Sequence, residues 1–207
     1  IDVVELDPKV AKIAQKYFDF DKSLVSLYFE DARTFVRRCL DKYDVILVDL
    51  FRGDGIPPHV VSFEFFADIK ECLSDHGAFV MNAFYGPISS ASRKSLFKTL
   101  VSVYDGIIVF EDPAKKEKKM QQGYILARKT KDPWSFTISV GSHPKFMVET
   151  LLPIFKNWKE YNQDSEFIKD VTPIYDERND WRRQTIDLDV AYRKMLISKL
   201  PWQVLLD

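Results

Sequence analysis

Three short apolar runs, each followed by an acidic residue, constrain what the first fifty positions of this chain can form. The runs cover residues 1–4, 24–29 and 43–48. The acids that follow them are Glu5, Asp31 and Asp49. The third run is almost continuously apolar, which is typical of a strand that is covered on both faces. Ligands of open α/β sheets bind outside the carboxyl ends of the strands, so the three acids predict a nucleoside-binding crevice with one carboxylate left for chemistry.

Helical and strand patterns alternate along the rest of the first two thirds of the chain. The expected helices cover residues 8–17, 32–40, 63–73 and 92–104, and the further strands cover residues 77–83, 107–111 and 124–128. This alternation predicts an α/β fold with a doubly wound, mostly parallel sheet and a late antiparallel strand. Residues 51–59 contain two glycines and two prolines and are expected to form a loop at the site.

The pattern becomes irregular after about residue 131. Helices are expected at 145–159 and 187–198, with an acidic and aromatic stretch between them. We therefore predict a ligand-binding α/β domain over residues 1–131 and a C-terminal extension packed on it over residues 132–207. All four tryptophans lie within residues 132–207, and aromatic residues are enriched at protein interfaces, so a homodimer contact through this extension is one expectation.

Composition excludes several classes of protein. The 207 residues carry a formal net charge of −1, which argues against nucleic acid as the main partner. Neither a membrane-spanning apolar run nor a signal peptide is visible in the sequence. The two cysteines and three histidines have no metal-ligand spacing, so no metal is expected. Cysteines placed singly in apolar helical patterns read as reduced core residues, which predicts a cytoplasmic protein.

Several segments, taken in order, resemble the spermidine synthase family. They are residues 3–8, 31–33, 43–49, 56–59, 62–66 and 73–82. The likeness covers roughly residues 1–128 and implies the Rossmann-like methyltransferase fold. Methyltransferases of the same nucleoside-binding class share most of these features, so the likeness is less specific for the reaction than for the fold.

The resemblance implies roles for four residues. Glu5 corresponds to the acid that binds the ribose hydroxyls of an S-adenosyl ligand, a role that suits a carboxylate facing a cis-diol. Asp31 corresponds to the acid near the adenine amino group, with the backbone of Ala32 beside the ring. Asp49 corresponds to the catalytic acid that orients and helps deprotonate an attacking amine. The implied co-substrate is S-adenosylmethionine or its decarboxylated form, and the implied acceptor is a small-molecule amine.

The sequence departs from the family pattern in two places. Arg52 stands where aminopropyltransferases carry a second acid, and a cation there would repel an ammonium substrate. Asp54 is a candidate replacement. The glycine-rich loop, strand and helix that precede this region in the family are not in the sequence. That strand lies between those ending at Glu5 and Asp49, so we expect a collapsed sheet or an unfilled slot of about 9–10 Å rather than one fully paired sheet.

Three further residues are candidate substrate contacts. His59 flanks the loop at the site, and Asp176 and Glu177 lie in a run that resembles the acidic loop near the end of spermidine synthase-like chains. A surface position is the alternative for each of them.

Three functions remain open from the sequence. The first is a spermidine synthase-like transferase that moves an aminopropyl group to a polyamine. The second is an S-adenosylmethionine-dependent methyltransferase on the same scaffold. The third is a catalytically silent binding or interaction module, which the arginine at position 52 and the missing glycine loop favour.

Overall fold

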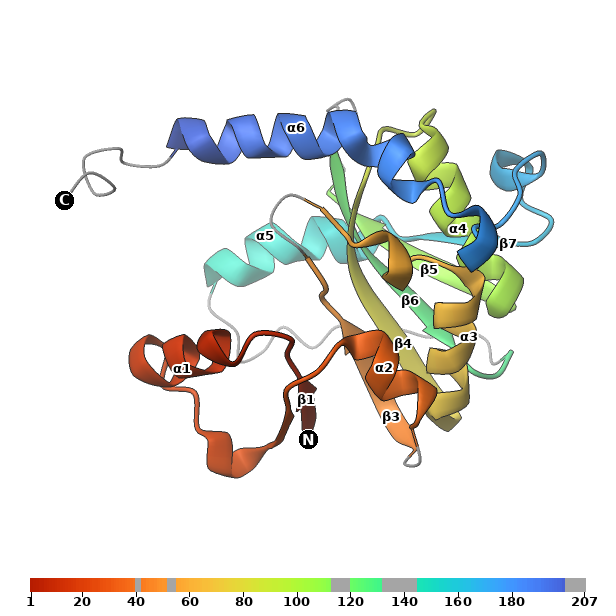
Figure 1. Cartoon of the computed structure of the whole chain (residues 1–207). Helices are drawn as coiled ribbons and strands as arrows, with labels where there is room; N and C mark the ends of the chain where they lie inside the picture. Colours follow the sequence, from red (N-terminus) through yellow and green to blue (C-terminus); the bar gives the residue numbers. More distant parts are fainter. Residues whose placement is uncertain (40–41, 52–54, 113–119, 132–144, 200–207) are drawn as a thin grey trace. The chain divides into compact units, whose positions relative to one another are not determined.

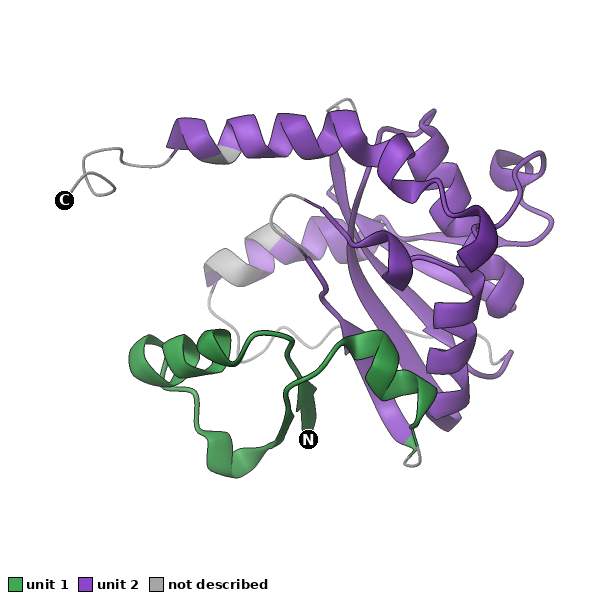
Figure 2. Cartoon of the chain, viewed as in Figure 1, with its two compact units in different colours: residues 1–42 green, residues 43–207 purple. Residues whose placement is uncertain are grey.

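The computed structural model describes residues 1–39, 42–51, 55–112, 120–131 and 145–199 (Figure 1). The chain divides into two compact units, residues 1–42 and residues 43–207 (Figure 2). Each unit is described by itself. The expected boundary near residue 131 lies inside the second unit, and the division into residues 1–131 and 132–207 stays a prediction.

The first unit is a small parallel pair of strands with two helices. Its elements are β1 (Asp2–Val4), α1 (Pro8–Tyr17), η1 (Lys22–Leu24), β2 (Ser26–Tyr28) and α2 (Ala32–Arg37). The strands pair in register from Asp2 with Ser26 to Val4 with Tyr28. The predicted start of α1 is confirmed: Pro8 occupies the first turn, and the Asp7 carboxylate accepts a hydrogen bond from the Lys9 amide at 2.9 Å.

The apolar stripe of α1 is not buried as its helical spacing predicts. Val10, Ile13 and Tyr17 are 48%, 52% and 65% exposed, and Ala11 is the buried apolar residue of this helix. A pair of three-residue strands offers too little apolar surface to cover such a stripe. The first unit therefore forms its elements without a substantial core of its own.

The second unit contains a five-stranded mixed sheet with the order β3-β4-β6-β5-β7. Its strands are β3 (Tyr43–Val48), β4 (Leu73–Tyr85), β5 (Gly106–Glu111), β6 (Gln121–Arg128) and β7 (Lys159–Asn162). Its helices are η2 (Pro58–Val60), α3 (Phe63–Cys72), α4 (Ala91–Val103), α5 (Lys145–Lys156), η4 (Glu166–Ile168), η5 (Asp176–Arg178) and α6 (Trp181–Lys199). The α/β class is confirmed, and the sheet is mixed: β3 is parallel to β4, and the other neighbouring strands are antiparallel. The expectation of a mostly parallel sheet does not hold for these five strands, because β6 returns antiparallel between β4 and β5.

The strands of the chain do not form one continuous sheet among the described residues. β1 pairs with β2 in a sheet of two strands, whereas β3 is the terminal strand of the five-stranded sheet. This separation agrees with the expectation that the strands ending at Glu5 and Asp49 are not joined into a single paired sheet.

The five-stranded sheet has one face toward α3 and α4 and the other toward α5. Phe79 of β4 contacts Phe66 of α3 and stacks on Tyr104 at the end of α4, with ring centroids 5.7 Å and 5.6 Å apart. Strand pairing puts Phe110 of β5 on the opposite face, where it contacts Phe155 of α5 at 5.4 Å. We call these the α3 face and the α5 face.

The outer strand β3 is less covered than its sequence predicts. Val45 and Leu47 point to the α5 face and are 61% and 66% exposed, whereas Val48, on the α3 face, is buried. The expectation of a strand covered on both faces is therefore wrong for β3. Within the second unit α5 contacts β5, and β4 and β6 lie between β5 and β3.

A buried polar cluster lies on the α3 face. The Arg93 guanidinium, 3% exposed, pairs with the Glu111 carboxylate at 2.7 Å, and the Tyr85 hydroxyl donates to the same carboxylate at 2.7 Å. A Cβ atom on Gly123 would lie 1.9 Å from the Tyr85 hydroxyl oxygen, so only glycine leaves room for this ring. Burial, reinforced by the negative charge of Glu111, raises the pKa of Tyr85 well above its ordinary value.

Candidate active site

Glu5 and Asp31 lie at the same edge of the small sheet, just beyond the carboxyl ends of β1 and β2. The Glu5 amide extends the pairing by donating to the Tyr28 carbonyl at 3.0 Å, and its carboxylate accepts from the Asp7 amide at 2.8 Å. Parallel strands bring their carboxyl ends to one edge of a sheet, so the sequence pattern predicts that Glu5 and Asp31 lie at the same edge. The structure places both candidates at one edge of this small sheet, and their contact with an adenosyl ligand stays a prediction.

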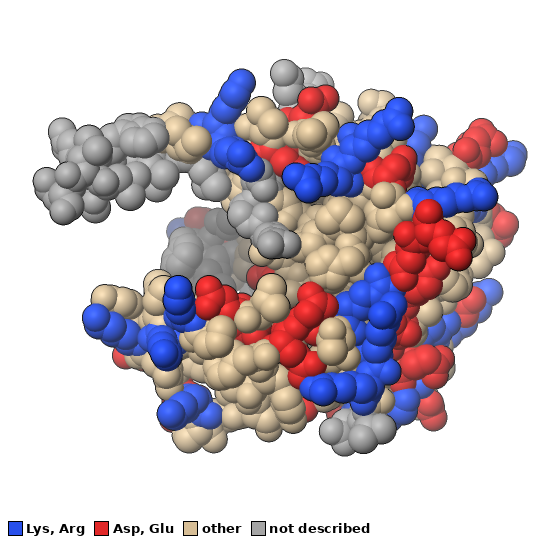
Figure 3. Space-filling model, viewed as in Figure 1, with Lys and Arg blue, Asp and Glu red and all other residues tan. Residues whose placement is uncertain are grey.

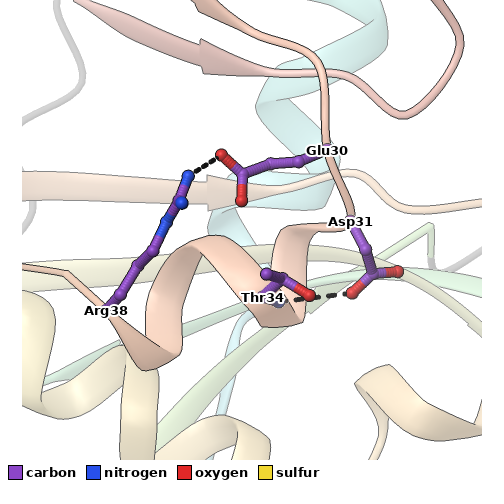
Figure 4. Close-up of polar contacts among 4 residues, drawn as sticks. All are labelled: Glu30, Asp31, Thr34 and Arg38. Atoms are coloured by element: carbon purple, nitrogen blue, oxygen red, sulfur yellow. Dashed lines mark hydrogen bonds and ion pairs between the residues drawn. The ribbon is translucent and has the colours of Figure 1, made fainter.

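The Asp31 carboxylate is the N-cap of α2. It accepts hydrogen bonds from the amides of Arg33 at 2.9 Å and Thr34 at 3.4 Å, and Figure 4 shows it with the neighbouring Glu30–Arg38 ion pair. Ala32, the first residue of the helix, is half-buried. The cap explains the position of Asp31 without any ligand, so its contact with adenine stays a prediction.

Asp49 lies just beyond the carboxyl end of β3, and two amides control its direction. The Asn82 side-chain amide of β4 donates to Asp49 Oδ1 at 3.0 Å, and Gln122 of β6 donates to the Asn82 carbonyl oxygen at 3.0 Å. Asp49 Oδ2 accepts no hydrogen bond from the described part of the chain. The arrangement holds an exposed carboxylate at the sheet edge.

A small aromatic cavity opens beside this edge. It has a volume of about 20 Å³, and its lining includes Phe51, Phe84, Trp181, Asp189 and Tyr192. Phe84 lies two residues after Asn82 on the same face of β4, and its ring contacts Phe51 at 5.1 Å and Tyr192 at 5.5 Å. The cavity therefore continues the edge on which Asp49 lies.

The start of α6 is anchored to the loop at the site. The buried Trp181 indole N–H donates to the Ile56 carbonyl at 3.1 Å. The Asn179 side chain donates to the carbonyls of Pro58 at 2.7 Å and Val61 at 3.2 Å. These bonds place the first turns of α6 against the loop that follows β3.

The remaining candidates are more dispersed. His59 is exposed on η2 and does not line the aromatic cavity. Glu177 lines a separate open cavity of about 570 Å³, together with Tyr175, Asn179 and Gln184. Asp176 is exposed, and its amide donates to Glu64 at 3.0 Å. Asp54, like Arg52, lies outside the described residues.

Figure 3 shows basic and acidic side chains interspersed on the visible face, without a broad basic surface among the residues drawn in colour. No cluster of three or more His, Cys, Asp or Glu residues suited to a metal ion occurs in the described ranges. Among the same ranges, no helix has both the length and the apolar character needed to cross a bilayer.

Sequence reasoning missed the amides behind Asp49 and the carboxylate of Asp189. Asn82 carried a detectable signal, because it is an amide within an otherwise apolar strand. Asp189 carried none, because its proximity to Gly55 depends on how α6 docks.

Comparisons with known proteins agree with this geometry. Residues 1–100 match the family described as the spermine/spermidine synthase domain. A polyamine aminopropyltransferase of Vibrio vulnificus is 41% identical over 88 residues, which are 41% of this chain and 29% of that protein. An N-terminal histidine N-methyltransferase of Emericella nidulans is 32% identical over 120 residues, which are 56% of this chain and 21% of that protein. The chain thus spans less than a third of the length of these two relatives.

Solved structures share the fold. A probable spermidine synthase from Corynebacterium glutamicum superimposes with a TM-score of 0.63 at 22% identity, over 84% of this chain and 63% of that one. A spermidine synthase in complex with the transition state analogue AdoDATO gives a TM-score of 0.52 at 18% identity, over 98% of this chain and 59% of that one. Residues 1–100 of this chain, just under half of its length, are thus similar to the spermine/spermidine synthase domain, and the solved structures share its fold.

Proposed function

We propose that the protein is an aminopropyltransferase that uses decarboxylated S-adenosylmethionine and a small polyamine acceptor. The observation that supports this most is the Asp49 carboxylate, oriented by Asn82 at the carboxyl end of β3. The resemblance to the spermidine synthase family implies that this acid orients and helps to deprotonate the attacking amine, and we propose that role for Asp49. Glu5, with Asp31 and Ala32, is proposed to bind the adenosyl group.

The proposed reaction is a displacement at carbon. The nitrogen of a neutral amine bonds to the carbon next to the sulfonium, and the carbon–sulfur bond breaks with its electron pair passing to sulfur. The products are the extended amine, a thioether nucleoside and a proton. Asp49 is proposed to hold the arriving ammonium and to accept its proton, while positioning in line lowers the barrier further.

The test is turnover by the Asp49→Asn variant, measured as release of methylthioadenosine from decarboxylated S-adenosylmethionine and 1,4-diaminobutane. We expect a fall of about 100-fold or more, because the amide cannot accept the proton. Asp44→Asn is the matched control: Asp44 is an exposed acid of the same strand, whose carboxylate accepts from Ser74 at 2.9 Å. Near-normal turnover by Asp49→Asn would reject the role of Asp49.

Methyl transfer is the second candidate, and the similarity to the histidine N-methyltransferase of Emericella nidulans favours it. The two candidate functions differ in the sulfonium compound that the protein should bind more tightly. Calorimetric preference for decarboxylated S-adenosylmethionine would support aminopropyl transfer, and preference for the intact form would support methyl transfer. Failure to bind either form, or methylthioadenosine, would leave the silent binding module.

The cellular location and the oligomeric state of the protein are also proposals. Neither Cys39 nor Cys72 is part of a disulfide, and because reduced cysteines are typical of a reducing compartment, we propose a cytoplasmic protein. A homodimer through the C-terminal extension remains a prediction that sedimentation would test.

A further inference from the structure

The aromatic cavity beside Asp49 has room for one small polar group. Its volume of about 20 Å³ exceeds the roughly 10–15 Å³ that a single water molecule needs, and an ammonium ion is of similar size. Aromatic and aliphatic side chains form most of the wall, and the one carboxylate is that of Asp189 on α6. A cavity of this composition suits a small cation better than a neutral or anionic group.

Asp189 lies against the loop that follows β3. A Cβ atom on Gly55 would be 2.6 Å from Asp189 Oδ1, so the carboxylate occupies space that only glycine leaves open. Its other oxygen lies 3.5 Å from the Thr185 hydroxyl, which is buried one turn earlier in α6. Asp189 has other interactions as well, so an arriving cation would join polar contacts that already orient the carboxylate.

The aromatic rings complete the surroundings of this carboxylate. Tyr192, three residues further along α6, contacts Phe84 with ring centroids 5.5 Å apart, and Phe84 contacts Phe51 at 5.1 Å. Aromatic faces attract an ammonium ion by about 0.5–2 kcal/mol. A hydrogen bond from the ammonium to a carboxylate adds a charge-assisted contact.

We infer that Asp189, with Phe84 and Tyr192, forms a subsite for a primary ammonium group of the amine acceptor. The inference rests on the proposed function and adds the residue that recognises the acceptor. In the family pattern a second acid stands in the loop, at the position that Arg52 occupies here. The inference assigns the role of that acid to Asp189 on α6, which lies outside the residues that match the family. The small volume selects a primary ammonium over a quaternary one.

The experiment is calorimetric titration of the full chain with 1,4-diaminobutane at low ionic strength. We expect Asp189→Asn to weaken binding about tenfold or more, since it removes a charge-assisted contact. The matched control is Asp187→Asn, which removes an exposed charge from the same helix and should change affinity less than twofold. Equal affinities of wild type and Asp189→Asn would overturn the inference, as would equally tight binding of tetramethylammonium.

A second variant tests the same carboxylate without removing its charge. Gly55→Ala adds a methyl group that must displace the Asp189 side chain, and we expect weaker diamine binding with the adenosyl ligand still bound normally. This variant decides the question if Asp189→Asn fails to fold. Unchanged diamine affinity in Gly55→Ala would count against the subsite.

Kinetics and adenosyl binding separate this inference from the proposed function. Asp189→Asn should raise the KM for the diamine while leaving kcat and the affinity for decarboxylated S-adenosylmethionine nearly unchanged. A parallel loss of adenosyl affinity would mean a general structural role and would reject the subsite. If the wild type binds no adenosyl ligand, the proposed function fails, whereas diamine binding that depends on Asp189 would still support the subsite.

Discussion

The direction of the Asp49 carboxylate depends on two neighbouring strands rather than on its own loop. Asn82 of β4 and Gln122 of β6 form a chain of hydrogen bonds behind it, at 3.0 Å each. The sequence reveals the acid at the strand end, because an apolar run followed by a carboxylate is a local pattern. It does not reveal that β6 lies beside β4, because that pairing depends on an antiparallel return over the sheet.

The buried cluster around Glu111 makes stability depend on pH. Tyr85→Phe should lower the free energy of unfolding by about 1–3 kcal/mol near neutral pH, since Glu111 loses a buried donor. The raised pKa of Tyr85 favours the protonated form in the folded state. Its contribution to stability is therefore complete below about pH 10 and is lost as the pH rises above that value.

Urea unfolding at a series of pH values, followed by circular dichroism, measures both effects. Burial also raises the pKa of Tyr161, so the variant should keep part of the alkaline loss of stability. Identical slopes for the wild type and Tyr85→Phe above about pH 10 would contradict the role given to Tyr85.

The helices that could be predicted from the sequence have both an apolar residue every three to four positions and a side chain that caps the first turn. Helix α3 begins where the sequence predicts because the Ser62 hydroxyl accepts from the Phe65 amide at 3.3 Å, and Ser90 caps α4 in the same way. Strand β7 was missed because Lys159–Asn162 is polar and shows no apolar alternation. Helix α6 starts at Trp181, six residues before the expected 187, because the buried indole anchors an otherwise polar first turn.

Docking of α6 gives a prediction for that element. Trp181→Phe keeps most of the buried ring but leaves the Ile56 carbonyl without its indole donor. We expect a loss of about 1–3 kcal/mol in the free energy of unfolding, measured by urea titration. Trp158→Phe, at a residue 39% exposed, should change it by less than about 0.5 kcal/mol. Equal effects of the two substitutions would argue against the anchor.

Over the whole molecule, the core belongs almost entirely to residues 43–207. Ala11 is the single buried apolar residue found in the described part of the first unit, whereas the second unit buries a set that includes Phe66, Phe79, Leu100 and Trp181. The α/β class follows from the alternation of patterns in the sequence. The uneven distribution of the core does not, because it depends on which strands pair.

This imbalance predicts the behaviour of the two units when they are produced separately. Residues 43–207 should unfold cooperatively in urea, since they hold the five-stranded sheet and its helices. Residues 1–42 should show no cooperative transition, because a two-stranded sheet without a core is marginal in water. Circular dichroism of each fragment measures this, and a sigmoidal transition for residues 1–42 would refute it.

The bonds from Trp181 and Asn179 to residues 56–61 have one further consequence. Suppose that Asp189 contacts an amine only while α6 is docked against residues 56–61. Amine binding and helix docking then share one coupling free energy, so each process favours the other by the same amount. Any change that loosens the first turns of α6 then lowers the apparent affinity for the amine, even when it leaves the sheet edge intact. The docked fraction of α6 would therefore rise when an acceptor amine binds.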